Sequence, residues 1–201
     1  MRYITLTDSY AEVTISRSRF MAFAYRVESE EDVMEKLKSL RKTYHDATHV
    51  CYAAIWDELG NMSRFSDDGE PSGTAGAPIM EVIKGAGLKK CLVAVVRYFG
   101  GVKLGTGGLT RAYSSVSADC IAKSKRIELI MCDIYRCNTD FATFKKLSGI
   151  NGISDISYTS DVSFTYACPV GEDITPLVDR TNGKLNYVKN AQSWKQLDTK
   201  A

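Results

Sequence analysis

Two glycine-rich segments hold the side chains of this sequence that are best suited to chemistry. Residues 64–76 read RFSDDGEPSGTAG and residues 97–111 read RYFGGVKLGTGGLTR. Eleven of the fifteen glycines lie in residues 60–108. Glycine is used where φ must be positive or where a ligand approaches the backbone, and loops on a rigid scaffold often carry function. Both segments are therefore candidate parts of one binding site, with tight turns between packed elements as the alternative.

Carboxylates gather in the first segment. Asp67, Asp68 and Glu70 lie within four residues, and Arg64 and Ser66 precede them. Such an oxygen cluster can hold Mg²⁺ with substrate phosphates completing its shell, although the spacing is not that of an EF-hand. Acidic groups ahead of a helix also interact favourably with its dipole, and Arg64 can pair with them. We expect a structural acidic cluster with no cofactor, and Mg²⁺ at Asp67, Asp68 and Glu70 is the alternative.

The second segment passes from an apolar run into a helical pattern. A strand followed by a helix presents free backbone N–H groups to an anion. The nucleotide motifs fail, because Thr110 stands where the dinucleotide fingerprint requires its last glycine, and Thr106 stands where Walker A requires lysine. The segment therefore predicts an anion- or RNA-binding loop of unspecified ligand. Its candidate residues are Arg97, Lys103, Gly105, Thr106, Gly107, Gly108 and Arg111.

The two histidines of the chain, His45 and His49, have the spacing of a zinc-binding helix. However, the helical pattern ends near Tyr44 and a strand begins at Val50, so the two rings need not share a face. A hydrogen-bonded His49 at the entrance of a strand is the preferred interpretation. No G-x-S-x-G nucleophile motif occurs, so no catalytic residue is assigned and enzymatic activity stays open.

Composition indicates a globular protein that is not strongly basic. The 201 residues are 44% hydrophobic and 25% charged, with a net charge of +2, so a basic binding face must come from the arrangement of charges. No run approaches the ~18 apolar residues of a membrane span, and the first twenty residues lack the apolar run of a signal peptide. Six scattered cysteines without a C-x-x-C pair are typical of a reducing compartment. We expect a cytoplasmic protein without a membrane partner.

Hydrophobic periodicity predicts the elements that position these segments. The expected order is a hairpin over 12–26 with a turn at 16–19, a helix at 30–44 capped by Ser29, a strand at 50–56, a helix at 75–84 followed by Gly85, a strand at 91–99 and a helix at 108–123. After the basic run at 123–126 the glycines become sparse. There we expect strands at 127–137, 153–160, 162–168 and 185–189 and helices at 140–148 and 172–181. This βαββαβ order is ferredoxin-like. The predicted fold class is therefore α+β, with domains at 1–126 and 127–201.

The two segments, taken together, resemble the YigZ/IMPACT family. The motifs are Ser18-Arg19-Phe20, His49, the R-x-S-D-D-G-E-P-x-G-T-A-G-x-P run from Arg64, and the R-Y-F-G-G-x-K-L-G-x-G-G-L-x-R-A-Y run from Arg97. They span residues 17–113, and the C-terminal segment resembles the ferredoxin-like domain of bacterial YigZ proteins. The resemblance implies an N-terminal domain of the type found in a ribosomal protein, in elongation factor G domain four and in GHMP kinases. It also implies a C-terminal domain similar to the last domain of elongation factor G.

The resemblance also implies a role in translation. Eukaryotic IMPACT members regulate translation initiation through a protein partner of a stress kinase, but the additional N-terminal domain of those proteins is not in this sequence, so we do not expect that partnership to transfer. We expect RNA or ribosome binding through the loop at 97–111 and the C-terminal sheet, where Tyr158, Phe164 and Tyr166 could stack bases.

Two other functions stay open. One is an enzyme for an anionic substrate, with Asp67, Asp68 or Glu70 as metal ligands or general base and Arg97 and Arg111 as clamps. The other is a protein-interaction module. Because neighbouring opposite charges favour pairing, we expect the three carboxylates to lie close to Arg97, Lys103 and Arg111 in one cleft.

Overall fold

The protein, described here by a computed structural model over residues 1–197, contains two compact units. One unit comprises Tyr3–Ile127, and the other begins at Glu128 and includes Met1 and Arg2. Each unit combines a sheet with helices, which confirms the α+β class. Among residues 1–197, no helix is both long and apolar enough to cross a membrane.

The N-terminal unit is built on a five-stranded sheet in the order β2-β3-β6-β4-β5. Its elements are β2 (Ser9–Ile15), β3 (Ser18–Arg26), α1 (Glu30–Thr43), β4 (His49–Ile55), β5 (Ser63–Ser66), α2 (Gly76–Gly85), β6 (Cys91–Tyr98) and α3 (Gly105–Lys123). All neighbouring strands are antiparallel. Because β3 and β4 both run antiparallel to β6, they are parallel to each other, and β3-α1-β4 is a split βαβ unit around β6.

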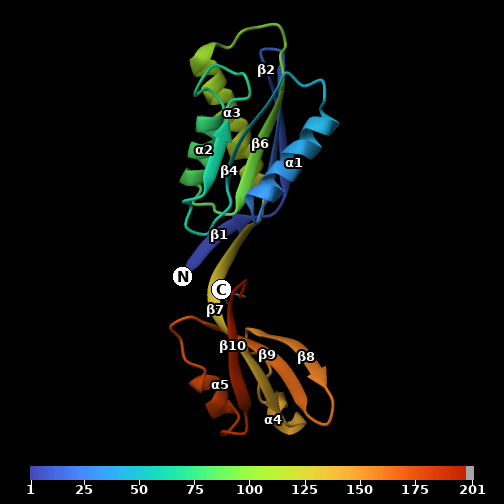
Figure 1. The fold of residues 1–201 in the computed structure, drawn as a ribbon, viewed down its shortest axis with the longest axis vertical. Helices are drawn as coiled ribbons and strands as arrows, with labels where there is room; N and C mark the ends of the chain where they lie inside the picture. The colour runs from blue at the N-terminus through green and yellow to red at the C-terminus, as the bar shows by residue number, and fades with distance from the viewer. Residues whose placement is uncertain (198–201) are drawn as a thin grey trace. The chain divides into compact units, whose positions relative to one another are not determined.

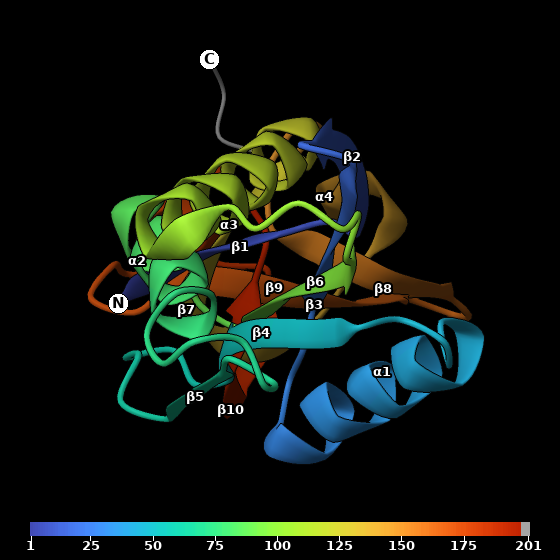
Figure 2. The same ribbon diagram turned by 90° about the horizontal axis from the view of Figure 1, so that it is seen from above.

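Helices cover both faces of this sheet. α2 and α3 lie on one face and α1 lies on the other, with the strands between them (Figure 1, Figure 2). The larger core joins Phe20 and Val95 of the sheet to Ile79 and Tyr113 of α2 and α3. The smaller core packs α1 against the opposite face. Burial on both faces explains why β6 reads as a continuous apolar run rather than an alternating one.

The ends of the helices follow from local chemistry. Ser29 caps α1 by accepting a hydrogen bond from the Asp32 amide, as predicted. The predicted stop of α2 at Gly85 is wrong, because Gly85 is its last helical residue. The left-handed residue is Gly87, with φ +68° and its N–H donated to the Lys84 carbonyl. A glycine at that position ends the helix because only glycine adopts positive φ without strain.

The C-terminal unit has the predicted βαββαβ order. Its elements are β7 (Arg126–Thr139), α4 (Phe141–Lys145), β8 (Ile153–Tyr158), β9 (Val162–Pro169), α5 (Thr175–Arg180) and β10 (Asn186–Lys195). These strands pair antiparallel in the order β10-β7-β9-β8. The first strand of the chain, β1, spans Arg2–Leu6. Both helices are shorter, and β10 longer, than the sequence predicts. The order is that of a ferredoxin-like domain.

Candidate functional site

The two glycine-rich segments meet at a hollow of about 320 Å³ in the N-terminal unit. The first segment contributes Glu70 and Pro71 to its wall. The second contributes Arg97, Phe99, Lys103, Leu104, Gly105, Thr106 and Leu109. This wall includes the end of β6, the connecting loop and the first turn of α3. The hollow therefore combines cationic, apolar and backbone groups.

A buried ion pair lies at this hollow. Arg97 Nη1 lies 2.5 Å from Glu70 Oε1, and the two side chains are only 5% and 3% exposed. Arg97 Nη2 also donates to Ser18 Oγ at 3.2 Å. The guanidinium carbon lies 5.1 Å from the Phe20 ring centroid and 5.5 Å from that of Phe99. Since a buried charge is costly unless paired, these contacts hold Arg97 in one position.

Glu70 is also linked to a pair of buried neutral groups. The Tyr113 hydroxyl donates to Glu70 Oε1 at 2.8 Å, and Cys51 Sγ lies 3.3 Å from that hydroxyl. Burial raises the pKa of Tyr113, and burial raises the pKa of Cys51 to about 12. The thiol is therefore protonated at neutral pH and does not serve as a nucleophile.

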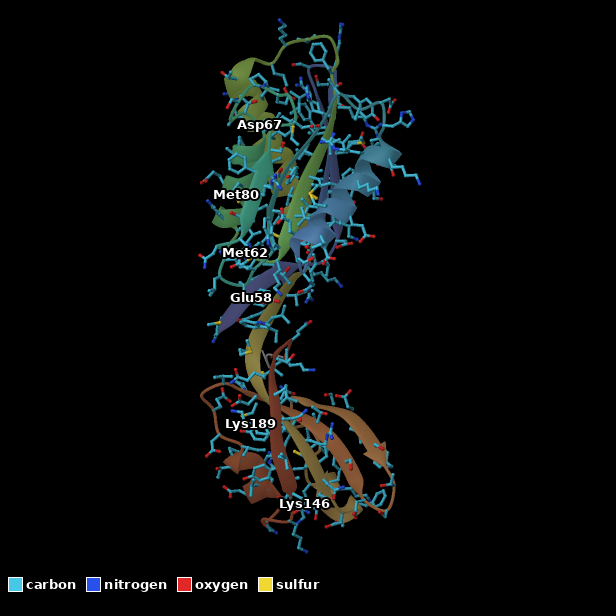
Figure 3. All side chains as sticks on the ribbon, in the orientation of Figure 1. Glu58, Met62, Asp67, Met80, Lys146 and Lys189 are labelled. Carbon is cyan, nitrogen blue, oxygen red and sulfur yellow. The ribbon has the colours of Figure 1, made fainter. Side chains whose placement is uncertain are left out.

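Asp67 has a structural role at the start of α2. Its carboxylate accepts hydrogen bonds of 2.8–2.9 Å from the amides of Gly73, Ala75 and Gly76, and Figure 3 labels it in the N-terminal unit. Burial acts to raise the pKa of Asp67, but the three amide hydrogen bonds outweigh it and leave the pKa below its ordinary value. The carboxylate satisfies amides that the helix itself leaves free.

Asp68 also lies outside the hollow. Its Oδ1 pairs with Arg41 at 2.7 Å and its Oδ2 accepts from the Val50 amide at 2.6 Å. Ser66 Oγ accepts from the Asp68 amide at 3.2 Å. The expectation that all three carboxylates share one cleft with Arg97, Lys103 and Arg111 is thus wrong. Glu70, Arg97 and Lys103 line the hollow, whereas Asp67, Asp68 and Arg111 do not.

The expected pairing of Arg64 with the acidic cluster is also wrong. Arg64 lies on β5 and pairs with Glu30 at 3.1 Å rather than with the acidic cluster. Glu70 is therefore the member of that cluster that reaches the hollow.

The side chains suggested for Mg²⁺ at the acidic cluster and for zinc at the two histidines do not form a set of metal ligands. Within residues 1–197, no three His, Cys, Asp or Glu side chains are grouped so that they could hold a metal ion. His49 Nδ1 lies 2.8 Å from the Asp68 carbonyl, and His49 is the first residue of β4. His49 is thus a hydrogen-bonded ring at the entrance of a strand, as predicted.

The start of α3 lies at the hollow, where the sequence predicts an anion-binding loop. The helix begins at Gly105, three residues before the predicted start at Gly108. Its N-cap residue, Leu104, makes no side-chain cap hydrogen bond, and the first turn contains no acidic residue. The first amides of a helix have no intrahelical partner, so those of Gly105, Thr106 and Gly107 are available beside Lys103.

Arg111 lies one turn further along α3 and does not line this hollow. It is exposed and lines a neighbouring hollow with Ile15 and Val82. Asp67 and Asp68, which we expected to lie close to Arg111, bind other groups. Within the described chain no ion pair of Arg111 is present, so its guanidinium faces solvent.

Sequence reasoning missed the contact that holds the loop in place. A Cβ added at Gly100 would lie 2.0 Å from the Arg17 carbonyl, so the loop touches the β2-β3 hairpin directly. The Gly100 amide donates to Ser18 Oγ at 3.1 Å. Ser18 thus connects Gly100 to Arg97, and its place in the Ser18-Arg19-Phe20 motif is the signal that could have found it.

In the C-terminal unit, the three aromatic candidates differ in exposure. Tyr158 is 62% exposed, whereas Phe164 is 2% exposed and belongs to the core. Tyr166 is partly buried against the same core. Base stacking on Phe164 is therefore wrong, because its ring is covered by packing.

Comparison with known proteins identifies the family. The Impact N-terminal domain model matches residues 16–121. The IMPACT family member YvyE of Bacillus subtilis is 35% identical in an alignment of 195 positions that covers 90% of each chain. The chain belongs to the IMPACT family.

Other IMPACT family proteins match mainly the N-terminal part. The family member YigZ of Escherichia coli is 40% identical over 101 residues, 49% of this chain and 50% of that protein. A crystal structure of a hypothetical protein superimposes with a TM-score of 0.64 and 26% identity over 94% of this chain and 98% of the other. The YigZ/IMPACT resemblance seen in the sequence is therefore confirmed.

Proposed function

We propose that this IMPACT-family protein acts in translation by binding RNA, free or in the ribosome, through the loop between β6 and α3. The observation that carries the proposal is that Lys103 and the first turn of α3 line the same hollow. Phosphate oxygens are bound by cationic side chains and by free amides at helix starts. The family supports the translational role, because its eukaryotic members regulate translation initiation.

The charges around the hollow support a net attraction for phosphate. Glu70 is neutralised by Arg97 at 2.5 Å, whereas Lys103 and Arg111 are exposed. The net charge of +2 is small, so the attraction is local. We place this activity in the cytoplasm, since all six cysteines are free and buried and a reducing compartment preserves them.

The test is RNA affinity as a function of salt. Fluorescence anisotropy with a labelled 20-nucleotide RNA, from 50 to 200 mM salt, should show log affinity falling linearly with log salt. Lys103→Ala should weaken binding for every sequence and lower that slope by about one unit, as should Arg111→Ala. Arg64→Ala is the matched control, since Arg64 is exposed on β5 and pairs with Glu30. Wild-type protein that binds neither RNA nor ribosomal subunits at low salt would overturn the proposal.

A second candidate function is an enzyme for a small phosphate-bearing substrate. A specific observation favours it: the hollow of about 320 Å³ is at the lower end of the ~300–1,000 Å³ range of ligand pockets, and the buried Glu70 carboxylate lines it. Inorganic phosphate and mononucleotides that raise the melting temperature, with no binding of RNA, would favour this function. Binding of neither class would leave a protein-interaction module.

A further inference from the structure

We infer that Phe99 is a fixed stacking platform for one unpaired RNA base, an inference that rests on the proposed RNA binding and names the form of RNA. Phe99 is 45% exposed at the start of the loop that leads from β6 to α3, which Figure 1 shows at the end of the N-terminal unit. An aromatic side chain exposed to this extent beside cationic groups is the surface that single-stranded nucleic acids use.

The ring is held in place from behind. The Phe99 amide donates to Thr48 Oγ1 at 3.0 Å, which fixes the backbone. The Arg97 guanidinium carbon lies 5.5 Å from the Phe99 ring centroid and 5.1 Å from that of Phe20. Since Arg97 is also paired with Glu70, Phe20, Arg97 and Phe99 form one ordered stack. A base would meet a ring that is already in position, which reduces the entropy cost of binding.

Two exposed cations belong to the segments around the platform. Lys103 lies in the same loop and is exposed. Arg17 is exposed at the tip of the β2-β3 hairpin, and its backbone is in direct contact with the loop at Gly100. Lys103 lines the same hollow as Phe99, and the Arg17 backbone contacts Gly100, the residue after Phe99. Both cations are therefore placed to contact phosphates next to a base stacked on Phe99.

The acidic groups nearby do not oppose an anion on this surface. Glu70 is bound to Arg97, and Glu12 pairs with Arg19 at 2.6 Å. Asp46 accepts a hydrogen bond from the Tyr98 hydroxyl at 2.7 Å. Tyr98 packs with Val50 and Val96, whereas Phe99 lines the hollow together with Arg97 and with Leu109 of α3. Lys103, which lines the same hollow as Phe99 and has no ion pair among residues 1–197, therefore supplies a positive charge beside the ring.

This geometry fits a single strand better than a duplex. A base stacked on Phe99 must be free of its neighbours, whereas bases in an A-form helix are stacked and paired. Stacking on a phenyl ring is tolerant of base identity, because every base has a π-face. The protein should therefore prefer unpaired RNA with little sequence specificity.

The experiment compares the full chain, three aromatic variants and Lys103→Ala by anisotropy. The probes are a labelled 12-nucleotide single-stranded RNA and the same sequence in a duplex. We expect wild type to bind the single strand more tightly, and Phe99→Leu to lose about five- to 150-fold of that affinity. Phe99→Trp should retain it, because tryptophan also stacks. Phe65→Leu is the matched control, since Phe65 is 50% exposed on β5, and it should leave affinity unchanged.

Two results would overturn the inference while leaving the proposed function intact. One is unchanged single-strand affinity in Phe99→Leu, with Lys103→Ala still weakening binding. The other is equal affinity of wild type for duplex and single strand. Absence of any RNA binding by wild type would overturn both the inference and the proposed function, so the two failures are distinguishable.

Discussion

Removal of the Glu70 carboxylate charge should strongly destabilise the N-terminal unit. In Glu70→Gln, the Arg97 guanidinium, which is 5% exposed and 2.5 Å from Glu70, would be left charged in a buried position. Ser18 Oγ and the two flanking aromatic rings remain, but they do not neutralise the charge. Breaking one partner of a buried pair costs about 3–5 kcal/mol.

The surface pair Arg64–Glu30 provides the scale for comparison. Its side chains are 59% and 46% exposed, and exposed pairs contribute about 0–1 kcal/mol. Glu70→Gln should therefore lower the melting temperature by about 10–20 °C, whereas Arg64→Met should change it by only about 0–4 °C.

A double-mutant cycle measured by urea unfolding checks this reasoning. Glu70→Gln with Arg97→Met should be more stable than Glu70→Gln alone, because the second change removes the unpaired charge. A loss below about 1 kcal/mol in Glu70→Gln, or additive effects in the double variant, would refute the role of the pair as the anchor of the loop.

Three further predictions concern the surroundings of this pair. Asp67→Ala should lower the free energy of unfolding by about 1–2 kcal/mol at pH 7. Because the folded pKa of Asp67 lies below its ordinary 3.8, the carboxylate contributes its full stabilisation above pH 3.8 and loses it as the pH falls through the folded pKa. Chemical unfolding from pH 7 to 3 checks this. Gly100→Ala should destabilise the protein, since the new methyl would clash with the Arg17 carbonyl. Gly107→Ala should raise the free energy of unfolding by about 0.5–1 kcal/mol, because the nearest atom to the new methyl is Arg111 Nη1 at 3.7 Å. A lower melting temperature for Gly107→Ala than for Gly100→Ala would contradict both expectations. Cys51, whose pKa is raised to about 12, should resist iodoacetamide at pH 8 until the protein is unfolded, as peptide mass spectrometry can show.

The elements with strong local signals could be predicted from the sequence. α1 has an N-cap serine and regular apolar spacing, and the structure begins it at Glu30. β5 spans only Ser63–Ser66, and none of its residues is fully buried, so no apolar pattern marks it. The start of α3 at Gly105 was missed because glycines are poor helix formers, and their density conceals a helix that tertiary packing stabilises.

The candidate site could be predicted only in part. Glycine content and charge indicated that the two segments form a site, and Glu70 does meet Arg97. Sequence could not show that Asp67 would be bound by amides up to nine residues away or that Asp68 would pair with Arg41. Which charges pair across loops depends on the tertiary positions of the loops, and local periodicity carries no information about them.

The central claim is that RNA binds at the loop between β6 and α3, and nuclear magnetic resonance mapping tests it most directly. Uniformly ¹⁵N-labelled protein of residues 1–201 would be titrated with a 12-nucleotide single-stranded RNA at low salt, and the amide shifts would be followed. We predict the largest shifts at residues 99–109 and at Arg17, and smaller shifts at the same RNA concentration in Lys103→Ala. Shifts confined to the C-terminal unit, or an unchanged spectrum at saturating RNA, would contradict the account.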